Sequence, residues 1–350
     1  MREQEPGVVG GKRLGAIKRK AVSLPQGEVV SVRPLVPGTS LPLLVQPAVE
    51  GVDLAAWAAT NRPFIEDSLL KHRGLLFRNF PVRTVPEFEQ FVRASSTGEL
   101  LEYRDRSTAR YSVGDKVYVS TIYPADQSID LHNEGTYWMA WPLKIYFCSL
   151  KVPPQGGATP IADVRGVFRR IDPRLRARFI EKRVMYVRNY NDGFGLPWQE
   201  VFQTTERAVV EEYCRQNAIE FEWKDGDGLR TRQVRPAVRV HPRTGETVWF
   251  NHAAFFHISA REEAVREALL SSFKEEDLPY NTFYGDGSPI EPAVVAEIRE
   301  AYRQEKVVFP WQPGDVLLLD NMSVAHAREP YQGERHVVVA MTEKCVAQEV

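Results

Sequence analysis

An imidazole and a carboxylate stand two positions apart in this sequence, at His132 and Glu134. On a β-strand alternate side chains point to the same face, so this spacing predicts that the two can bind one metal ion together. A third ligand has to come from elsewhere, and the candidate is His326. Two imidazoles and one carboxylate on one face of a metal leave the opposite positions open, as in non-haem Fe(II) oxygenases.

A His-x-Glu pair alone is a weak signal, because two polar residues on an exposed strand face occur in many unrelated proteins. The late position of His326, after an apolar strand, strengthens the metal hypothesis, since ligands from opposite ends of a β core are far apart in sequence. Two short motifs that follow the ligands strengthen it further, and they are Gly156-Gly157-Ala158-Thr159 and Gly333-Glu334-Arg335.

With these motifs the sequence resembles the taurine/2,4-D dioxygenase superfamily of Fe(II)/2-oxoglutarate enzymes. Within it the sequence is similar to the branch that includes the syringomycin aspartyl hydroxylase. The resemblance runs from about Leu75 to Met341. It passes through several ordered motifs, namely Tyr123-Pro124-Ala125, Leu131-His132-Asn133-Glu134, residues 153–163, Trp249-Phe250-Asn251, and Trp311-Gln312-Pro313-Gly314-Asp315 to Arg335.

The resemblance implies a function for each of five residues. His132, Glu134 and His326 would hold Fe(II), while Arg335, helped by the Thr159 hydroxyl, would bind the distal carboxylate of 2-oxoglutarate. A planar guanidinium suits this task because it can donate two parallel hydrogen bonds to a carboxylate. The cofactors implied are Fe(II), 2-oxoglutarate and O2.

Glu134 also indicates the reaction outcome. Halogenating members of the family carry a small residue at this position, which leaves a coordination position for chloride. The carboxylate therefore favours hydroxylation of an unactivated C–H bond. Desaturation, epoxidation or cyclisation on the same centre stays open, as do a non-catalytic regulatory protein of the same fold and a hydrolytic Zn²⁺ site.

The substrate is the least determined part of the hypothesis. The resemblance favours an amino-acid-like substrate, free, in a peptide or bound to a carrier protein, in natural-product biosynthesis. Candidate substrate contacts are Asn133, Asn251, Arg328 and Arg110. Arg328 is also a rival anchor for 2-oxoglutarate, and a solvated surface arginine is the plainer interpretation. Arg110 belongs to a polar segment that either faces the pocket mouth or only solvates an edge strand.

Composition excludes several other function classes. The 350 residues are 43% hydrophobic and 26% charged with a formal net charge of −1, so no general attraction to nucleic acid or anionic lipid is expected. No apolar run approaches the roughly 20 residues that a membrane helix needs. Three scattered cysteines suit a reducing compartment, and we expect a soluble cytoplasmic protein. Homo-oligomerisation is left open.

The elements that must position these residues are mostly strands. We expect a mainly β protein with flanking helices and a double-stranded β-helix (jelly-roll) core. Residues 1–26 are predicted to be a flexible basic arm, and residues 27–350 a single domain. That domain would have a helical flank at 41–95, a core at about 110–345 and a lid or insert at about 185–290. Helices are predicted at 53–72, 85–95, 163–179 (N-capped by Asp163) and 206–217. Strands are predicted at 41–47, 74–80, 117–121 and 143–150, around 221 and 238, and at 248–252, 314–320 and 335–341.

Overall fold

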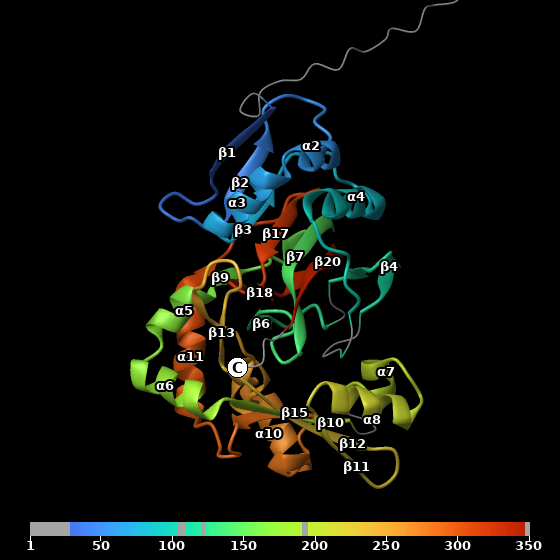
Figure 1. Ribbon diagram of the computed structural model, residues 1–350, viewed down its shortest axis with the longest axis vertical. Helices are drawn as coiled ribbons and strands as arrows, with labels where there is room; N and C mark the ends of the chain where they lie inside the picture. Colours follow the sequence, from blue (N-terminus) through green and yellow to red (C-terminus); the bar gives the residue numbers. More distant parts are fainter. Residues whose placement is uncertain (1–28, 104, 106–109, 121–122, 191–194, 347–350) are drawn as a thin grey trace, which may run out of the picture.

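A computed structural model describes residues 29–103, 105, 110–120, 123–190 and 195–346. The predicted basic arm at 1–26 lies outside the described residues. Figure 1 shows the N-terminal strands and helices at one end, two sheets in the middle, and the segment from about 184 to 284 at the other end. In the part of the chain that the structure describes, no helix is long and apolar enough to cross a membrane.

The largest sheet among the described residues has eight strands, and the long strands β7 and β20 lie inside it next to each other. All neighbouring strands pair antiparallel except β2 and β3, which are parallel. In spatial order the strands are β1 (Val30–Pro34), β2 (Leu43–Pro47), β3 (Gly74–Phe77), β17 (Val316–Asp320), β7 (Ala140–Lys151), β20 (His336–Val346), β5 (Val117–Val119) and β4 (Ser112–Gly114).

A smaller sheet carries two of the predicted ligands. Its strands, in spatial order among the described residues, are β16 (Lys306–Val307), β9 (Ile161–Asp163), β18 (Val324–Arg328) and β6 (Ile129–His132). One buried cluster contains side chains of both sheets, including Phe147 and Leu319 of the large sheet and Ile161 and Val324 of the small one. The two sheets therefore share a core. Beside them, β8 (Gln155–Gly156) pairs with β19 (Tyr331–Gln332).

Three helices cover the N-terminal part of the large sheet (Figure 1). They are α2 (Leu54–Thr60), α3 (Arg62–His72) and α4 (Val85–Ser95). The prediction at 85–95 is confirmed, and Thr84 and Glu87 form a capping box at its start. The prediction of one continuous helix at 53–72 is wrong. The helix ends at Thr60 and a new one starts at Arg62, because Pro63 has no N–H to donate and can stand only in the first turn of a helix.

The helix predicted at 163–179 is divided in the same way. Asp163 is the N-cap of α5 (Val164–Arg170), as expected, and its side chain accepts a hydrogen bond from the backbone N–H of Arg165. A second helix, α6 (Pro173–Lys182), then starts with a proline. Proline favours the first turn, where its missing N–H costs nothing.

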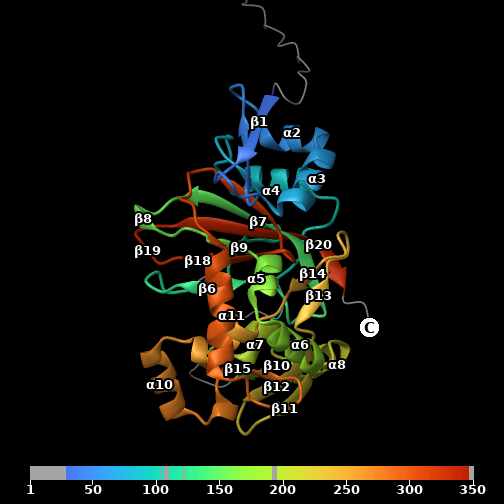
Figure 2. The same cartoon turned by 90° about the vertical axis from the view of Figure 1, so that its left-hand side faces the viewer.

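The middle of the chain forms a sheet of its own, and three of its strands, β10, β12 and β15, had no sequence prediction. Among the described residues its strands are β11 (Glu220–Trp223), β12 (Leu229–Arg235), β10 (Val184–Tyr190) and β15 (Tyr280–Tyr284). A hairpin, β13 (Val238–Val240) with β14 (Thr247–Trp249), leads back toward the metal-motif strands. The helical segments here are α7 (Trp198–Phe202), α8 (Arg207–Gln216), α9 (Ala253–Phe256), η1 (Ile258–Ala260), α10 (Glu263–Ser272), η2 (Glu275–Asp277) and α11 (Pro292–Glu305). Figure 2 shows α11 running from this part toward the smaller sheet.

Candidate metal centre

His132 and His326 face each other across two neighbouring strands. They are directly paired in the register of β6 and β18, and their ring centroids lie 4.5 Å apart. Glu134 joins them, and one ligand atom from each of the three side chains lies within 4.8 Å of the others. The structure therefore brings together three residues that are far apart in the sequence. Two nitrogens and one carboxylate oxygen are a donor set that suits Fe(II).

Glu134 reaches this position differently from the sequence prediction. The prediction placed it on the same strand as His132, but β6 ends at His132 and Glu134 lies in the following turn. Asn321, which the sequence analysis missed, fixes that turn. Its side-chain amide binds both the N–H of Glu134, at 2.8 Å, and the C=O of Glu134, at 2.9 Å. No local sequence pattern reveals this contact, because it joins distant segments.

The two histidines have the protonation state that a metal requires. Burial, as the largest cause, lowers the pKa of His132 and of His326, so both rings are neutral at neutral pH. Nδ1 of His132 donates to the carbonyl of Asp130 at 2.8 Å, which leaves Nε2 with its lone pair. Nδ1 of His326 is buried and has no hydrogen-bond partner among the described residues. The residues present therefore fit a metal ion.

The carboxylate of Glu134 is held by two buried side chains. The Tyr103 hydroxyl donates to Oε1 at 2.9 Å, and Nη2 of Arg110 donates to Oε2 at 3.0 Å. Arg110 was predicted as a substrate contact, and the structure places its guanidinium on Glu134. The contact of Tyr103 with Glu134 was not predicted from the sequence.

Arg335 and Thr159 lie together on the same small cavity as His132 and His326. Arg335 donates from Nε to the carbonyl of Gly157 at 2.9 Å and from Nη2 to the Thr159 hydroxyl at 3.3 Å. Burial, reinforced by the charge of Arg328, lowers the pKa of Arg335 to about 10, so it stays charged at neutral pH.

Thr159 has a second partner that the sequence analysis did not assign. Nε1 of Trp311 donates to the Thr159 hydroxyl oxygen at 3.0 Å. Trp311 belongs to a motif that carried the family resemblance, and that motif was the signal that could have found it. The contact orients the Thr159 hydroxyl beside Arg335.

Two predicted substrate contacts are engaged with the backbone. Asn133 is fully buried, and its Nδ2 donates to the carbonyl of Asn321 at 2.7 Å. Asn251 donates to the carbonyl of Ala237 at 2.6 Å and accepts from the N–H of Ala253 at 2.9 Å. Both amides are therefore well placed to fix loops around the centre.

Arg328 is buried, and the interpretation of it as a solvated surface arginine is wrong. Its guanidinium donates to three backbone carbonyls, those of Tyr123 at 2.9 Å, Pro124 at 2.5 Å and Gln127 at 2.7 Å. It therefore holds the 123–127 segment next to the centre, and this contact could not be read from the sequence.

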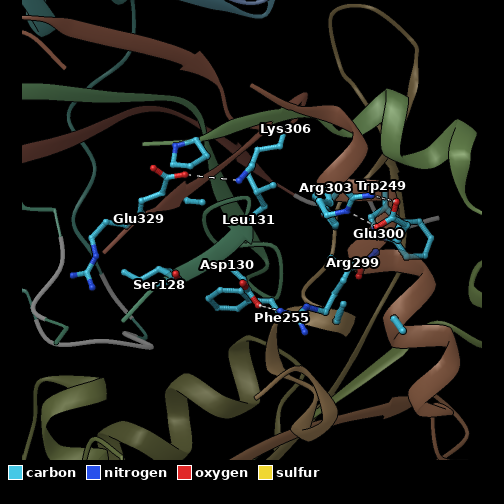
Figure 3. Close-up of a pocket in the computed structure, with 18 of the residues that line it drawn as sticks. Ser128, Asp130, Leu131, Trp249, Phe255, Arg299, Glu300, Arg303, Lys306 and Glu329 are labelled. Carbon is cyan, nitrogen blue, oxygen red and sulfur yellow. Dashed lines mark hydrogen bonds and ion pairs between the residues drawn. The ribbon is translucent and has the colours of Figure 1, made fainter. Parts of the chain in front are cut away.

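A second, larger cavity of about 580 Å³ lies between β6, the end of β18 and α11 (Figure 3). Its lining includes Asn251, Arg328 and Phe255, and the Phe255 ring stacks on His132 with centroids 4.6 Å apart. Arg328 also lines the small cavity of the metal centre. The two cavities are therefore neighbours.

The rim of the larger cavity is charged, with side chains of both signs. Two ion pairs cross it, Arg299 with Asp130 at 3.2 Å and Lys306 with Glu329 at 3.8 Å, and Figure 3 shows both. All four side chains are more than a third exposed. Exposed pairs of this kind contribute about 0–1 kcal/mol, so a charged ligand can exchange partners with them at little cost.

The chain is similar to known proteins over most of its length. The family model described as taurine catabolism dioxygenase TauD, TfdA family, matches residues 31–341. The chain is 41% identical over 312 residues to the dapdiamide synthesis protein DdaC of Enterobacter agglomerans, covering 89% of this chain and 94% of that protein.

Solved structures have the same fold. The structure of PvcB from Pseudomonas aeruginosa matches with a TM-score of 0.54 and 14% identity, covering 93% of this chain and 94% of that one. Another structure of PvcB, described as an Fe, alpha-ketoglutarate dependent oxygenase from an isonitrile synthetic pathway, matches with a TM-score of 0.53 and 15% identity over the same shares. At these identities the likeness concerns the fold alone.

Proposed function

This chain belongs to the TauD, TfdA family of dioxygenases, and we propose that it hydroxylates an unactivated C–H bond of an amino-acid-like small molecule. As a family member it is an Fe(II)- and 2-oxoglutarate-dependent oxygenase that uses O2. The family, enzyme class and cofactors predicted from the sequence are therefore confirmed. The residue assignments, the reaction outcome and the substrate are the proposal.

The proposal assigns Fe(II) to His132, Glu134 and His326. The single observation that carries it is the convergence of these three buried side chains, whose ligand atoms lie within 4.8 Å of one another. When bound, the Fe(II) supplies the coupling of 2-oxoglutarate decarboxylation to C–H oxidation by O2. The surrounding protein keeps the rings of His132 and His326 neutral and fixes the turn that carries Glu134.

Arg335 is the proposed anchor for the distal carboxylate of 2-oxoglutarate. Its guanidinium is partly buried, and within the described residues its hydrogen bonds go only to uncharged oxygens, those of Gly157, Thr159 and Ser120. A partly buried cation without an anion has an uncompensated desolvation cost, which a bound carboxylate would offset. Arg328 is the weaker candidate, because three backbone carbonyls already occupy its donors.

Hydroxylation is the proposed outcome because Glu134 occupies the third ligand position with a carboxylate. This leaves no vacancy at that position for a halide. Desaturation, epoxidation and cyclisation are alternatives on the same centre, since they differ from hydroxylation in where the substrate radical lies.

The larger cavity is the proposed substrate site. About 580 Å³ is within the size range of small-molecule pockets, and its apolar floor includes Trp249 and Phe255. Its rim carries both cations and anions, which suits a ligand with a carboxylate, an ammonium group and an apolar body. Asn251 and Arg328 lie on its wall, which supports the proposal that they lie near the substrate. The relative DdaC is named for dapdiamide synthesis, which supports a place in natural-product biosynthesis.

Two finer structural assignments belong to the same proposal. The shared core of the large and small sheets supports a double-stranded β-helix, with the two predicted iron-binding histidines on its smaller sheet. We also propose that residues 27–350 are one dioxygenase domain with a helical flank at 41–95, a core at about 110–345 and an insert at about 185–290.

The test is a coupled assay with Fe(II), 2-oxoglutarate and O2. Free amino acids, short peptides and carrier-bound aminoacyl groups are the candidate substrates, and succinate and product mass are measured together. Hydroxylation adds one oxygen atom to the product, whereas desaturation removes two hydrogens. His132→Ala and His326→Ala are expected to abolish O2-dependent succinate formation. Full turnover in either variant would remove the iron assignment.

A further inference from the structure

Both carboxylate oxygens of Glu134 are occupied by hydrogen-bond donors. Tyr103 binds Oε1 and Arg110 binds Oε2, at 2.9 and 3.0 Å. All three side chains are buried, with exposed fractions of 1% for Tyr103, 6% for Arg110 and 4% for Glu134. In such surroundings a hydrogen bond to a charged oxygen is strong and not displaced by water.

The two donors form one unit. The Arg110 guanidinium lies over the Tyr103 ring, 4.1 Å from its centroid, which fixes their relative position. Tyr103 is itself held, since its backbone N–H donates to the Tyr118 hydroxyl at 3.2 Å and its ring packs edge-on against Trp138. The direction of the Glu134 carboxylate is therefore set by a braced pair of neighbours.

A carboxylate can bind a metal ion through one oxygen or through both. In a six-coordinate centre with three protein ligand atoms, three positions remain. The two chelating oxygens of 2-oxoglutarate and O2 need all three. If both oxygens of Glu134 bound the metal, one position would be lost. Glutamate is prone to this, because its extra methylene gives the carboxylate one more torsion than aspartate has.

We propose that Tyr103 and Arg110 are positioning residues that restrict Glu134 to one-oxygen coordination and so keep a position open for 2-oxoglutarate. The inference rests on the proposed assignment of Glu134 as an iron ligand. Each donor holds its carboxylate oxygen in a fixed direction, so the oxygen that does not bind the metal cannot turn toward it. Hydrogen-bonding partners of metal ligands commonly act by orienting them.

The test separates metal binding from 2-oxoglutarate binding in the absence of O2. Apoprotein of the wild type, Tyr103→Phe, Arg110→Met and Arg110→Lys is titrated with Co²⁺, and the Co²⁺-loaded protein is then titrated with 2-oxoglutarate. The Co²⁺ absorption spectrum reports the coordination number, which turnover does not. Tyr146→Phe is the matched control, because Tyr146 is a buried tyrosine whose hydroxyl accepts from Ser95 outside the site.

We expect Tyr103→Phe and Arg110→Met to keep Co²⁺ binding close to wild type while weakening 2-oxoglutarate binding by about tenfold. Their Co²⁺ spectra should change, whereas that of Tyr146→Phe should not. Arg110→Lys should recover part of the loss, because lysine keeps one charged donor. If Arg110→Met does not fold, Tyr103→Phe carries the test alone, since it removes only one oxygen atom.

Two results would overturn the inference while leaving the proposed function intact. One is wild-type 2-oxoglutarate affinity and spectra in Tyr103→Phe and Arg110→Met. The other is a parallel loss of Co²⁺ and 2-oxoglutarate, which would indicate general damage to the site. If His326→Ala bound Co²⁺ as the wild type does, the proposed iron site would fall, and this inference with it.

Discussion

Asn321 binds the backbone of Glu134 from both sides. Its Oδ1 accepts from the N–H of Glu134 at 2.8 Å, and its Nδ2 donates to the C=O of Glu134 at 2.9 Å. The same Nδ2 also donates to the carbonyl of Pro142 at 2.9 Å. One buried amide thereby joins the turn that carries one proposed iron ligand to the segment that leads to another, His326.

Replacing Asn321 by alanine is expected to weaken metal binding by about 10- to 100-fold, because Glu134 would lose its fixed position. Unfolding of the apoprotein should become easier by about 1–3 kcal/mol, since buried backbone groups would be left without partners. Anaerobic Fe(II) titration and urea denaturation measure the two effects. Asn61→Ala, at a helix end in the N-terminal flank, is the control and should leave metal binding unchanged. Unchanged metal affinity in Asn321→Ala would show that Glu134 is positioned by other contacts.

Two arginines compete as the anchor for 2-oxoglutarate, and substitution distinguishes them. Arg335→Lys should raise the 2-oxoglutarate requirement by about tenfold or more, since lysine cannot reproduce the paired hydrogen bonds of a guanidinium. Arg328→Lys should leave that requirement nearly unchanged and instead release the carbonyls of the 123–127 segment. The Michaelis constant for 2-oxoglutarate, measured in each variant, shows which arginine is the anchor. A larger increase of this constant in Arg328→Lys than in Arg335→Lys would make Arg328 the anchor.

Several features of the fold and of the site follow from local patterns in the sequence. The helix Val85–Ser95 is capped by Thr84 and Glu87, a spacing that is visible in the sequence. The family motifs led to His132, Glu134 and His326, which the structure brings together. The divided helices could have been predicted as well, because Pro63 and Pro173 are each tolerated only at a helix start.

The errors at the site concern side-chain direction, which depends on contacts between distant segments. The spacing of His132 and Glu134 indicated a shared strand, but Glu134 lies beyond the strand end and is held by Asn321. Arg110 turns to Glu134, and Arg328 turns to a neighbouring loop. No periodicity in the sequence fixes the direction in which a loop arginine points.

The charged rim of the larger cavity predicts a selective effect on substrate binding. Arg299→Gln should raise the Michaelis constant of a zwitterionic substrate by about tenfold, because the ligand carboxylate would lose a charged donor on α11. The Michaelis constant for 2-oxoglutarate should not change. Arg93→Gln is the control, since Arg93 is an equally exposed arginine of α4 that pairs with Glu89 and Asp115. Equal constants in Arg299→Gln and the wild type would place the substrate elsewhere.

Stability should fall in mildly acidic solution, and His257 is one cause. This ring is 4% exposed, and its Nδ1 accepts from the N–H of Ser259 at 3.1 Å, so protonation there would break a hydrogen bond. Burial lowers the pKa of His257 to about 4, from an ordinary value of 6.5. Between these values the unfolded chain binds the proton and the folded protein does not. The contribution of neutral His257 to the free energy of unfolding is therefore complete above about pH 6.5, and it is lost progressively as the pH falls toward 4.

From pH 7 to pH 5 the loss that comes from His257 should be about 2 kcal/mol in the free energy of unfolding. Urea denaturation of the wild type and of His257→Asn at both pH values measures it. Asparagine keeps an acceptor for Ser259 but does not titrate, so the variant should lose about 2 kcal/mol less than the wild type over this range. The other buried histidines are present in both proteins and cancel in the comparison. His72→Asn, which replaces a partly exposed histidine, should follow the wild type. If the free energy of unfolding fell equally from pH 7 to pH 5 in the wild type and in His257→Asn, His257 would not contribute to the acid sensitivity.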